Sequence, residues 1–512
     1  MLQTASNKKI RVRFAPSPTG PLHIGGVRTA LFNYLFAKQN AGEFILRIED
    51  TDSARFVPNA EDYIIESLNW LGLKFDEGVG VGGAFAPYRQ SQRKDLYFKY
   101  AEQLVKSGNA YYAFDSAEDL DIIRKSYEMQ GKSFIYNHAV RNTMKTSLAM
   151  NNTELQQCLN EEKHWVIRFK IPPHEEITMR DIIRGEIKVN TDTLDDKVLF
   201  KAVDMLPTYH LANIVDDRLM EISHVIRGEE WLPSLPLHIL LYRAFGWQNP
   251  EFAHLSLLLK PDGKGKLSKR DGDRLGFPVF PLEWKNAEGE ISAGYRETGY
   301  FPEAVVNLLA LLGWNPGTEQ EIFNIDELIN NFSLERVIKS GAKFNPEKAR
   351  WFNQQYIRKK SNEELANLYQ PILKSKGINA DNNYVATVCG LVKERATFIN
   401  DFWNLSSYFF VAPEIYDEKA TKKYWSDETP QHLQKIIEII DSAPFDKEKT
   451  EQSVHTWIAD SGLKMGSVMN AFRICVVGSA TGANMFDIVN LTGKDETVRR
   501  IKKAIGAMTG KT

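Results

Sequence analysis

The sequence has little of what would indicate a secreted or membrane protein. It contains three cysteines in 512 residues, Cys158, Cys389 and Cys475, and no two of them form a CxxC pair. Cysteines that are so widely spaced are typical of a protein in a reducing compartment and indicate no disulfide framework. No segment approaches the roughly 20 apolar residues that span a bilayer, and Met1–Arg13 has no apolar signal-peptide core. We therefore expect a cytoplasmic protein with no membrane contact.

The sequence also lacks an excess of charge of either sign. Its formal net charge is −2, so nothing in the whole chain draws it toward nucleic acid. Binding to nucleic acid would depend on local basic patches such as Arg358–Lys360 and Arg499–Lys503, although such patches are more often simply solvated surface. With 43% hydrophobic and 25% charged residues the composition is that of an ordinary globular protein. The length indicates three or four domains.

Two short segments carry most of the chemical information. Pro16–Gly26 (PSPTGPLHIGG) follows an extended stretch at Arg11–Ala15 and opens a helix-like run at Gly26–Asn40. A glycine-containing turn between a strand and a helix can hold phosphate oxygens against backbone N–H groups. Lys266–Arg270 (KLSKR) lies in a loop rich in Gly and Lys after the apolar run Leu255–Leu259, and its lysines can clamp a triphosphate from the other side. Together they predict a nucleotide held between two jaws, although each segment alone is more typical of a capping turn or a solvated loop.

The joint occurrence of the two segments resembles class I aminoacyl-tRNA synthetases. His23–Gly26 is similar to their HIGH signature, and Lys266–Arg270 to their KMSKS signature. Two further strings, Arg13–Gly20 and Arg47–Asp52, narrow the resemblance to the glutamyl/glutaminyl branch. The strings that are similar to bacterial glutamyl enzymes are Pro207–Asp217 and Val225–Trp231. The resemblance covers nearly the whole chain and is densest before Arg270.

The resemblance implies ATP-dependent ligation of L-glutamate to tRNA(Glu) through a glutamyl-adenylate, with release of AMP and pyrophosphate. Mg²⁺ would arrive with ATP and not occupy a dedicated protein site, and we expect a monomer. The nearest alternative is an enzyme that also charges tRNA(Gln) with glutamate. A glutaminyl enzyme and a shortened relative that modifies a tRNA base fit the long helical tail less well. An inactive tRNA-binding paralogue should have lost His23 or the Lys266–Arg270 loop.

On the nucleotide side the chemistry requires positioning and electrostatic stabilisation, because two anions must approach one another and no covalent nucleophile is needed. The catalytic candidates are His23, Gly25, Gly26, Lys266, Ser268 and Lys269. The resemblance implies that ATP is bound by Pro16, Thr19, Gly20, His23, Gly25, Glu230, Leu259 and Lys269, with Trp231 a weaker candidate near the base.

Selection of glutamate requires a cation with directed donors for the γ-carboxylate. Alternation along an extended chain places Arg13, Ala15 and Ser17 on one face, and the resemblance implies that these positions line the glutamate pocket. Glu49 can accept a hydrogen bond from the substrate ammonium. The remaining pocket candidates are Tyr209, Asn213 and Arg227. Without the resemblance, Glu49 could equally belong to a helix-capping turn and Arg227 to a surface ion pair.

The alternation of strands and helices predicts an α/β Rossmann-type catalytic domain with a parallel sheet. Strands are expected at Arg11–Ala15 and Phe44–Ile48, and a helix at Ala60–Leu71. Residues from about 91 to 205 break this rhythm and indicate an inserted α+β segment, with strands expected at Val166–Ile171 and Glu186–Val189, and an all-α region follows. The resemblance implies that the insertion is an acceptor-binding domain and that the helical region binds the anticodon. The expected boundaries are 1–90 and 206–265 for the two catalytic halves, 91–205 for the insertion, 266–358 for the KMSKS loop and stem-contact domain, and 359–408 and 409–512 for the two helical parts.

The helical tail favours a glutamyl enzyme over a glutaminyl one, because glutaminyl enzymes end in β-barrels. Helices are expected at Phe301–Leu312, Glu363–Gln370, Tyr384–Phe398 and Val454–Ile458, and an irregular connection at Tyr408–Lys422. Single-stranded RNA is read by arginine and by aromatic stacking. Arg395 and Arg473 fall where similar bacterial enzymes place anticodon-reading arginines, although a solvated face is a competing interpretation.

Many relatives bind a structural Zn²⁺ in the inserted domain through pairs of cysteines. The corresponding positions here are Ala113, Asp115, Val140 and Asn142. A closed zinc site needs four nitrogen or sulfur ligands, so we predict no zinc and no other metal site. The neighbouring His138 is interpreted as an ordinary surface or packing histidine.

Overall fold

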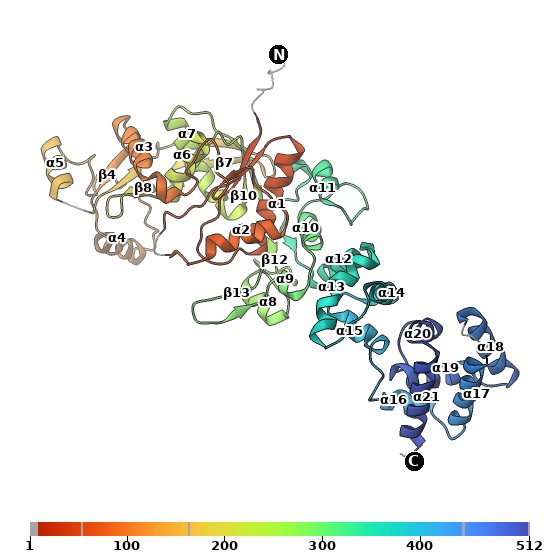
Figure 1. Cartoon of the computed structure of the whole chain (residues 1–512). Helices are drawn as coiled ribbons and strands as arrows, with labels where there is room; N and C mark the ends of the chain where they lie inside the picture. The colour runs from red at the N-terminus through yellow and green to blue at the C-terminus, as the bar shows by residue number, and fades with distance from the viewer. Residues whose placement is uncertain (1–8, 53–54, 162–163, 443–445, 510–512) are drawn as a thin grey trace. The chain divides into compact units, whose positions relative to one another are not determined.

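The computed structural model describes residues 9–52, 55–161, 164–442 and 446–509. The chain divides into two compact units, Met1–Ala349 and Arg350–Thr512 (Figure 1). Every strand in the described ranges lies in the first unit, and the second unit is helical there. None of the helices that the structure describes is both long enough and apolar enough to cross a bilayer.

The first unit is organised around a parallel sheet. Strands β1 (Arg11–Phe14), β2 (Glu43–Leu46) and β3 (Glu77–Gly78) are paired in that order, each pair parallel. Val12 of β1 opposes Phe44 of β2, and both side chains are fully buried. The expectation of a parallel α/β sheet is confirmed, and the two predicted strands agree with β1 and β2 to within two residues.

A second parallel pair lies beside β1. Strand β10 (His224–Gly228) pairs with β11 (Glu251–Leu255), and Ser223 N donates to Arg11 O over 2.9 Å just before β10 begins. β1 therefore has β2 on one side and β10 on the other, and the strand order reverses between β1 and β10. Ligands of open parallel sheets bind beyond the carboxyl ends of the strands at such a reversal. The loop that follows β1 lies at this edge.

Helix α1 (Ile24–Gln39) carries the chain from β1 to β2 and packs against β1, β2 and β10. Its buried residues include Val27, Leu31 and Leu35 at helical spacing, and α10 (Pro302–Leu311) and α11 (Ile325–Asn331) also pack on it. A helix that is enclosed in this way holds its first turn rigidly against the sheet. The helix predicted from Gly26 begins two residues earlier, because His23 serves as its N-cap.

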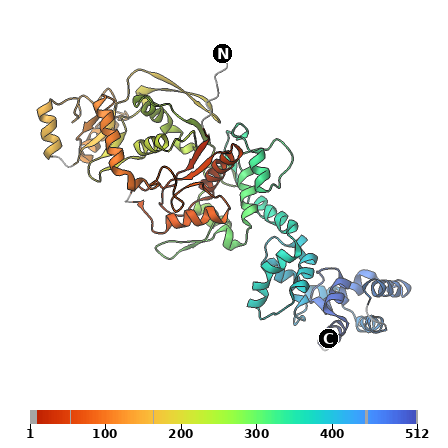
Figure 2. The same cartoon turned by 45° about the horizontal axis from the view of Figure 1, so that its top comes forward.

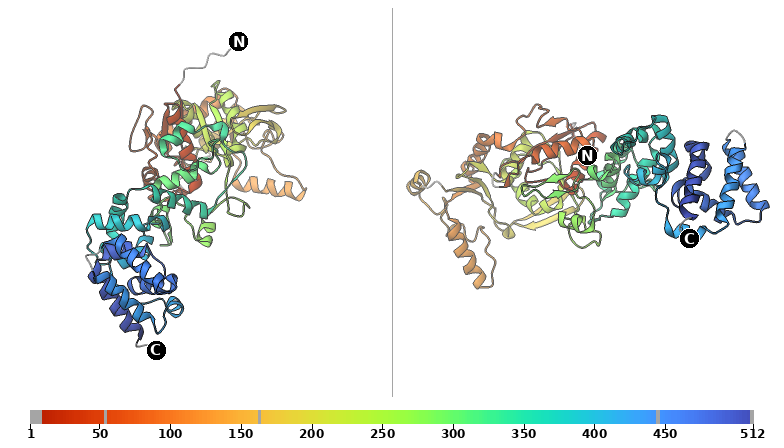
Figure 3. Two further views of the ribbon diagram at one scale, coloured as in Figure 1. Left: turned by 90° about the vertical axis from the view of Figure 1, so that its right-hand side faces the viewer. Right: turned by 60° about the horizontal axis from the view of Figure 1, so that its bottom comes forward.

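The inserted segment has its own antiparallel sheet with the strand order β4-β5-β8-β9. Its orange helices lie at the edge of the first unit in the views of Figures 1 and 3. The hairpin β6 (Glu176–Asp181) and β7 (Gly185–Asn190) packs back against β11. The other elements from α2 to β9 are α2 (Ala60–Trp70), α3 (Lys94–Lys106), β4 (Ala110–Ala113), α4 (Ala117–Met129), α5 (Asn152–Glu161), β5 (Val166–Phe169), β8 (Val198–Lys201) and β9 (Leu206–Pro207).

The remaining elements of the first unit follow the inserted segment in the chain. Strand β12 (Leu258–Leu259) pairs in parallel with β15 (Ala342–Lys343), on either side of the Lys266–Arg270 segment in sequence. The other elements are α6 (Tyr209–Leu219), α7 (Leu235–Ala244), α8 (Lys269–Leu275), β13 (Trp284–Lys285), β14 (Ile291–Ser292) and α9 (Tyr295–Thr298). The helix expected at Phe301–Leu312 is α10, which has Pro302 in its first turn, where proline is well tolerated.

The second unit consists of short helices (Figure 2). They are α13 (Asn362–Ser375), α14 (Asn382–Val392), α15 (Asp401–Ser406), α16 (Glu418–Tyr424), α17 (Thr429–Asp441), α18 (Lys447–Asp460), α19 (Met465–Val477), α20 (Met485–Thr492) and α21 (Lys494–Thr509), with α12 (Pro346–Lys359) at its beginning. The expectation of a helical tail is confirmed.

Three local predictions in the second unit need correction. The helix expected over Tyr384–Phe398 ends as α14 at Val392, because a 3-10 turn follows and Thr397 N and Phe398 N donate to the carboxylate of Asp401. The stretch expected to be irregular, Tyr408–Lys422, contains most of α16. In the basic patch Arg499–Lys503, Arg500 is only 3% exposed and donates to the carbonyls of Tyr408 and Val476, so it cannot contribute to a surface for RNA.

Candidate active site

Two adjoining cavities open at the carboxyl edge of β1 and β10. The larger, of about 780 Å³, lies between the loop that leads into α1 and the Lys266–Lys269 segment. The smaller, of about 230 Å³, is lined by Arg13, Glu49 and Arg227 among others. Ser17 and Glu230 line both cavities, so the two spaces share a wall. This arrangement can hold two ligands side by side with their reacting ends in contact.

His23 lies in the wall of the larger cavity. Its Nδ1 accepts a hydrogen bond from Gly25 N over 3.1 Å, so the ring proton must sit on Nε2. Burial, with a smaller contribution from Lys266, lowers the pKa of His23 to about 4, so the ring is neutral at physiological pH. Nε2 is buried and has no hydrogen-bond partner among the described residues. The cavity wall therefore contains a fixed N–H donor that is not used by the described residues.

The glycines after His23 act differently from the expectation. Gly25 N is bonded to His23 Nδ1, and Gly26 N donates to His23 O over 2.8 Å. The N–H groups that were expected to face phosphate oxygens are thus already used within the turn. A Cβ on Gly26 would lie 2.7 Å from Leu22 Cδ1, so a larger residue there would have to displace the end of the Leu22 side chain. The donor that this turn leaves free is the imidazole N–H of His23.

The Lys266–Lys269 segment supplies positive charge to the larger cavity. Lys266 and Lys269 line the larger cavity together with Ser268. Lys266 Nζ donates to Glu230 Oε1 over 3.2 Å, while Ser268 caps α8 and its hydroxyl donates to Asp271. Lys269 is partly exposed and makes no ion pair with any residue that the structure describes. The segment therefore places a free ammonium group beside the cavity.

Arg13 enters the smaller cavity as an oriented cation. Its Nε and Nη2 donate to the two carboxylate oxygens of Asp217, at 3.0 and 3.2 Å, and its side chain is 3% exposed. This two-point pairing fixes the plane of the guanidinium group. Burial opposes ionisation of Asp217, but Arg13 and Arg47 outweigh it and lower the pKa of Asp217 below its ordinary value. Arg13 Nη1 has no partner among the described residues and remains available to an anion.

Glu49 also lines the smaller cavity. Its Oε1 accepts hydrogen bonds from Arg47 Nη2 at 3.1 Å and from Asn213 Nδ2 at 3.2 Å. Arg47 is fully buried and also donates to Asp217 over 2.8 Å, so it links the two carboxylates. Burial raises the pKa of Glu49 in spite of Arg47 and Arg13. A cationic ligand group at this site would offset the desolvation cost of the charged form and stabilise Glu49 as the carboxylate.

Arg227 is the second cation of the smaller cavity, and Tyr209 and His254 hold it in place. Nη1 donates to Tyr209 Oη over 2.8 Å, and Nε donates to His254 Nε2 over 3.0 Å. His254 Nδ1 is 2.6 Å from Asp181 Oδ2, so the ring donates to Asp181 through Nδ1 and accepts from Arg227 through Nε2. Burial lowers the pKa of His254, which keeps the ring neutral and able to accept from Arg227. Because Asp181 belongs to β6, the inserted segment helps to orient this arginine.

The cavities gather nearly all of the residues that were predicted from the sequence. All seven glutamate-pocket candidates line the smaller cavity. The larger cavity is lined by every catalytic and nucleotide candidate except Leu259, whose side chain lies over Gly341 while Leu257 and Leu258 line the cavity. Trp231 lies in the smaller cavity, with its ring 4.2 Å from that of Tyr209, and not beside the larger one.

Comparisons with known proteins agree with this geometry. A model of the catalytic domain of class I tRNA synthetases (E and Q) matches residues 9–351, and a model of an anticodon binding domain matches residues 364–505. A glutamate–tRNA ligase of Phocaeicola vulgatus is 58% identical over 504 residues, which cover 98% of this chain and 99% of the relative. The chain belongs to the class I glutamate–tRNA ligases. This membership confirms the family inferred from the HIGH-type and KMSKS-type segments.

Further relatives of the ligase support the same assignment. A glutamate–tRNA ligase of Flavobacterium johnsoniae is 58% identical over 503 residues, covering 98% of this chain and all of the relative. A crystal structure of a glutamate–tRNA ligase from Elizabethkingia meningosepticum, in complex with its amino acid, is 53% identical and has a TM-score of 0.95. It covers 98% of this chain and 99% of that chain. A class I synthetase uses ATP, so the larger cavity belongs to an ATP-dependent ligase.

Four buried residues of the ligase site were not identified as site residues from the sequence. They are Arg47, Asp181, Asp217 and His254, each of which holds a residue of the smaller cavity in place. Arg47 and Asp217 stood in strings that resembled the family, and both are charged residues within apolar surroundings, which is an unusual place for an unpaired charge. Asp181 and His254 are 73 positions apart and gave no sequence signal of their pairing.

The two anticodon candidates of the ligase both lie in the second unit. Arg395 is exposed in the 3-10 turn after α14, and Arg473 is half-buried on α19, where its Nη1 donates to Ala483 O. Burial lowers the pKa of Arg473, and Arg395 lowers it further by repulsion.

Proposed function

We propose that this glutamate–tRNA ligase makes glutamyl-adenylate in the two adjoining cavities and transfers the glutamyl group to tRNA(Glu). The observation that supports this proposal most strongly is the division of charge between the cavities. The smaller holds two oriented arginines opposite a carboxylate, which is complementary to an amino acid with an acidic side chain. The larger has a neutral histidine donor and lysines, which are complementary to phosphates.

Glutamate is held in the smaller cavity by Arg13, Arg227 and Glu49. The free Nη1 of Arg13 donates to the γ-carboxylate, and Arg227 together with Tyr209 donates to carboxylate oxygen. Glu49 accepts from the substrate ammonium. With glutamine in the same place Arg13 would keep Asp217 as its anion, but its Nη1 donor would lose the charged acceptor, which costs about 1–3 kcal/mol. This corresponds to roughly 5- to 150-fold in discrimination.

ATP occupies the larger cavity with its phosphates between His23 and the Lys266–Lys269 segment. An oxygen of the glutamate α-carboxylate attacks the α-phosphorus, and the bond to the bridging oxygen of pyrophosphate breaks. His23 Nε2–H donates to a phosphoryl oxygen, and Lys269 stabilises the leaving pyrophosphate. Mg²⁺ is carried in with ATP, and its chemistry is to neutralise phosphate charge. Removing one such donor costs about 3–4 kcal/mol in the transition state.

In the second step a ribose hydroxyl of the tRNA terminus attacks the carbonyl carbon of the adenylate, and AMP leaves. We infer that Arg395 and Arg473 contact the anticodon, because both are cations of the second unit and Arg473 senses the charge of Arg395. An exposed arginine at 395 favours strict choice of tRNA(Glu) over an enzyme that also charges tRNA(Gln). We propose that the ligase acts as a monomer.

We further propose that the inserted domain folds without the zinc that many relatives bind. Ala113 is part of an apolar cluster with Tyr111 and Met144, against which Val140 packs. The fully buried Tyr111 hydroxyl donates to Asp196 over 2.7 Å, which ties the cluster to the strands around it. These contacts supply the cohesion that a closed zinc site would otherwise give.

The proposed function is tested by aminoacylation with four combinations of substrate: glutamate or glutamine, with tRNA(Glu) or tRNA(Gln). Rapid charging of tRNA(Glu) with glutamate alone is the expected result. Charging of tRNA(Gln) with glutamate at a comparable kcat/KM would replace strict choice by the relaxed alternative. Release of pyrophosphate from ATP with glutamine as readily as with glutamate would contradict the assignment of the smaller cavity.

A further inference from the structure

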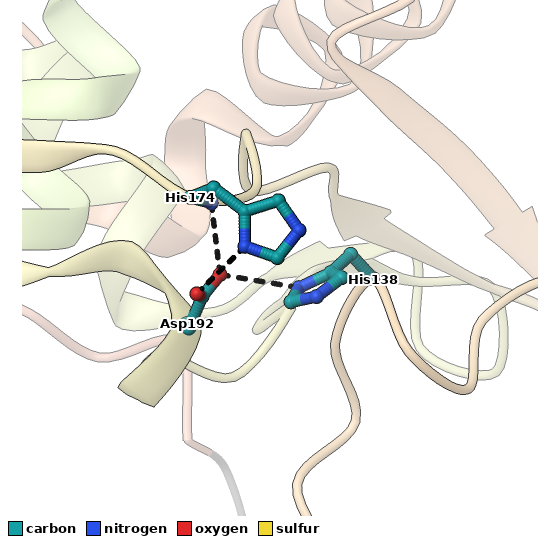
Figure 4. A group of neighbouring side chains, drawn as sticks. All are labelled: His138, His174 and Asp192. Carbon is teal, nitrogen blue, oxygen red and sulfur yellow. Dashed lines mark hydrogen bonds and ion pairs between the residues drawn. The ribbon is translucent and has the colours of Figure 1, made fainter.

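Outside the active site, three side chains that can bind metal converge in the inserted domain. His138 lies in the loop after Tyr136, His174 between β5 and β6, and Asp192 in the 3-10 turn that follows β7 (Figure 4). His174 Nδ1 is 2.9 Å from Asp192 Oδ2, and His138 Nδ1 is 3.5 Å from Asp192 Oδ1. One ligand atom from each residue lies within 4.8 Å of the other two.

We propose that His138, His174 and Asp192 bind one divalent transition-metal ion such as Zn²⁺. Nitrogen and oxygen ligands of tetrahedral Zn²⁺ lie about 2.0–2.2 Å from the metal and so about 3.3–3.5 Å from one another. His138 Nδ1 and His174 Nδ1 approach different oxygens of Asp192, and the two histidine rings meet edge to face with centroids 4.8 Å apart. Rotation of the exposed His174 and of the half-buried His138 and Asp192 side chains would bring one atom of each to the required spacing.

The backbone holds the three segments together without any ion. Thr191 N donates to Glu175 O over 2.9 Å, and Glu175 N donates to Thr191 Oγ1 over 3.0 Å, which joins the 174 and 192 loops. Asn137 Nδ2 donates to Asp192 O over 3.0 Å, which joins the 138 loop to them. Thr191 is 1% exposed, so this junction is part of the domain core. A metal ion would meet a largely preformed site, which limits the ordering that binding requires.

The ligand set and its access determine the class of ion. Two imidazoles with one carboxylate suit Zn²⁺, Ni²⁺ or Co²⁺, whereas Mg²⁺ and Ca²⁺ prefer sites made of oxygen atoms. Asp192 Oδ1 accepts from the backbone N–H of His174 over 2.8 Å, which orients the carboxylate. The His174 side chain is 74% exposed and the His138 side chain 24%, so water can fill the remaining coordination positions. On binding, each imidazole presents a nitrogen lone pair to the metal. A nitrogen that had donated its N–H to Asp192 gives up that proton, which the other nitrogen of the same ring then carries.

This site is separate from the position at which many relatives hold zinc. It uses none of Ala113, Asp115, Val140 and Asn142, and Asp115 accepts from the hydroxyl of Tyr136 instead. A three-ligand site open to solvent binds exchangeably, in contrast to a closed four-ligand site. The ion is therefore an addition to a folded domain, and its effect is to tie three loops to one another.

The test uses tag-free, full-length ligase that has been treated with chelator and then titrated with ZnCl₂ by calorimetry. We expect one equivalent to bind with a dissociation constant in the micromolar range, to raise the Tm, and to persist in millimolar Mg²⁺. Co²⁺ should give the visible absorption of a site with nitrogen and oxygen ligands. His174→Ala and Asp192→Asn should each weaken binding by about tenfold or more, while aminoacylation stays near that of the wild type.

His164→Ala is the matched control, because it removes an exposed histidine of the same domain that is not in the cluster. It should bind Zn²⁺ as the wild type does. Absence of a saturable equivalent in the wild type would overturn the proposal. So would full Zn²⁺ affinity in both His174→Ala and Asp192→Asn, or displacement of Zn²⁺ by millimolar Mg²⁺. Because His174 is largely exposed, its truncation should leave the Tm of the metal-free protein unchanged, which checks that the variant is folded.

Discussion

Replacing His254 tests whether a buried hydrogen-bond acceptor must hold the Arg227 guanidinium in place for glutamate to bind. His254 is fully buried, accepts from Arg227 Nε through Nε2, and faces Asp181 through Nδ1. His254→Leu keeps an apolar volume but removes the acceptor, so one buried N–H of the guanidinium loses its partner. Asp181 would retain its bonds from the backbone N–H groups of Ile183 and Arg184, at 3.0 and 2.8 Å. The damage should therefore concentrate on Arg227.

A buried donor that loses its partner costs about 1–3 kcal/mol, which corresponds to roughly 5- to 150-fold in an equilibrium constant. Since Arg227 would bind the substrate equally in the ground state and in the transition state, the change should appear in KM for glutamate, with kcat and KM for ATP nearly unchanged. His254→Gln offers an amide oxygen near the position of Nε2 and should restore part of the lost affinity. This pattern identifies His254 as a positioning residue.

The assay is steady-state aminoacylation with glutamate and ATP varied separately, together with the Tm of each variant. His224→Leu serves as the control, because His224 is half-buried on the adjoining strand and bonds to Ser223 and not to Arg227. A His254→Leu enzyme with a lowered Tm but an unchanged KM for glutamate would contradict a positioning role for His254. A KM for ATP that rises as much as KM for glutamate would contradict it as well.

Three further predictions concern the rest of the molecule. Lys269→Ala should lower aminoacylation about 10²-fold or more, with the Tm unchanged, because it withdraws positive charge from the leaving pyrophosphate. Lys264→Ala in the same loop is the control and should have little effect. Near-normal turnover of Lys269→Ala would exclude a role for Lys269 in binding pyrophosphate. Burial lowers the pKa of His210 to about 4 from 6.5, so between these values the unfolded chain binds more protons and stability falls as pH falls. Urea unfolding of His210→Gln should therefore show a flatter decline from pH 7 to pH 5 than the wild type, and an identical decline would contradict the assignment. After chelation with EDTA and return to Mg²⁺, the ligase should keep its aminoacylation rate, and an unfolded inserted domain would show that it needs a structural metal.

Local pattern and chemistry made much of the fold predictable. The helix expected at Ala60–Leu71 and the strands around Phe44 and Val166 are recognisable from apolar periodicity alone, because each buries one continuous stripe or run. The ends of helices were mispredicted where a short-range hydrogen bond decides them. His23 capping α1 and Asp401 holding the turn after α14 both depend on a side chain that bonds a nearby backbone N–H group. Apolar periodicity does not report such bonds.

The candidate site was predictable for residues within characteristic strings and unpredictable for those that support them. Arg13 and Glu49 lie in such strings, whereas the Asp181–His254 pair joins the inserted domain to β11 across a long stretch of chain. Three-dimensional closeness of this kind leaves no spacing in the sequence. The same reason explains why His138 was interpreted as an ordinary histidine. Its neighbours His174 and Asp192 are brought to it only by the folding of two later loops.

The central claim is that a fixed guanidinium at Arg13 selects glutamate while ATP binds next to it. The most direct measurement is tRNA-dependent glutamate activation and ATP affinity in the same preparation of Arg13→Leu, with Tm as the check on folding. Asp217 would still be paired with Arg47 over 2.8 Å, so the variant keeps one partner for the buried carboxylate. We expect kcat/KM for glutamate to fall roughly 10²–10³-fold and ATP affinity to be unchanged. Unchanged glutamate kinetics in a folded Arg13→Leu enzyme would contradict the claim.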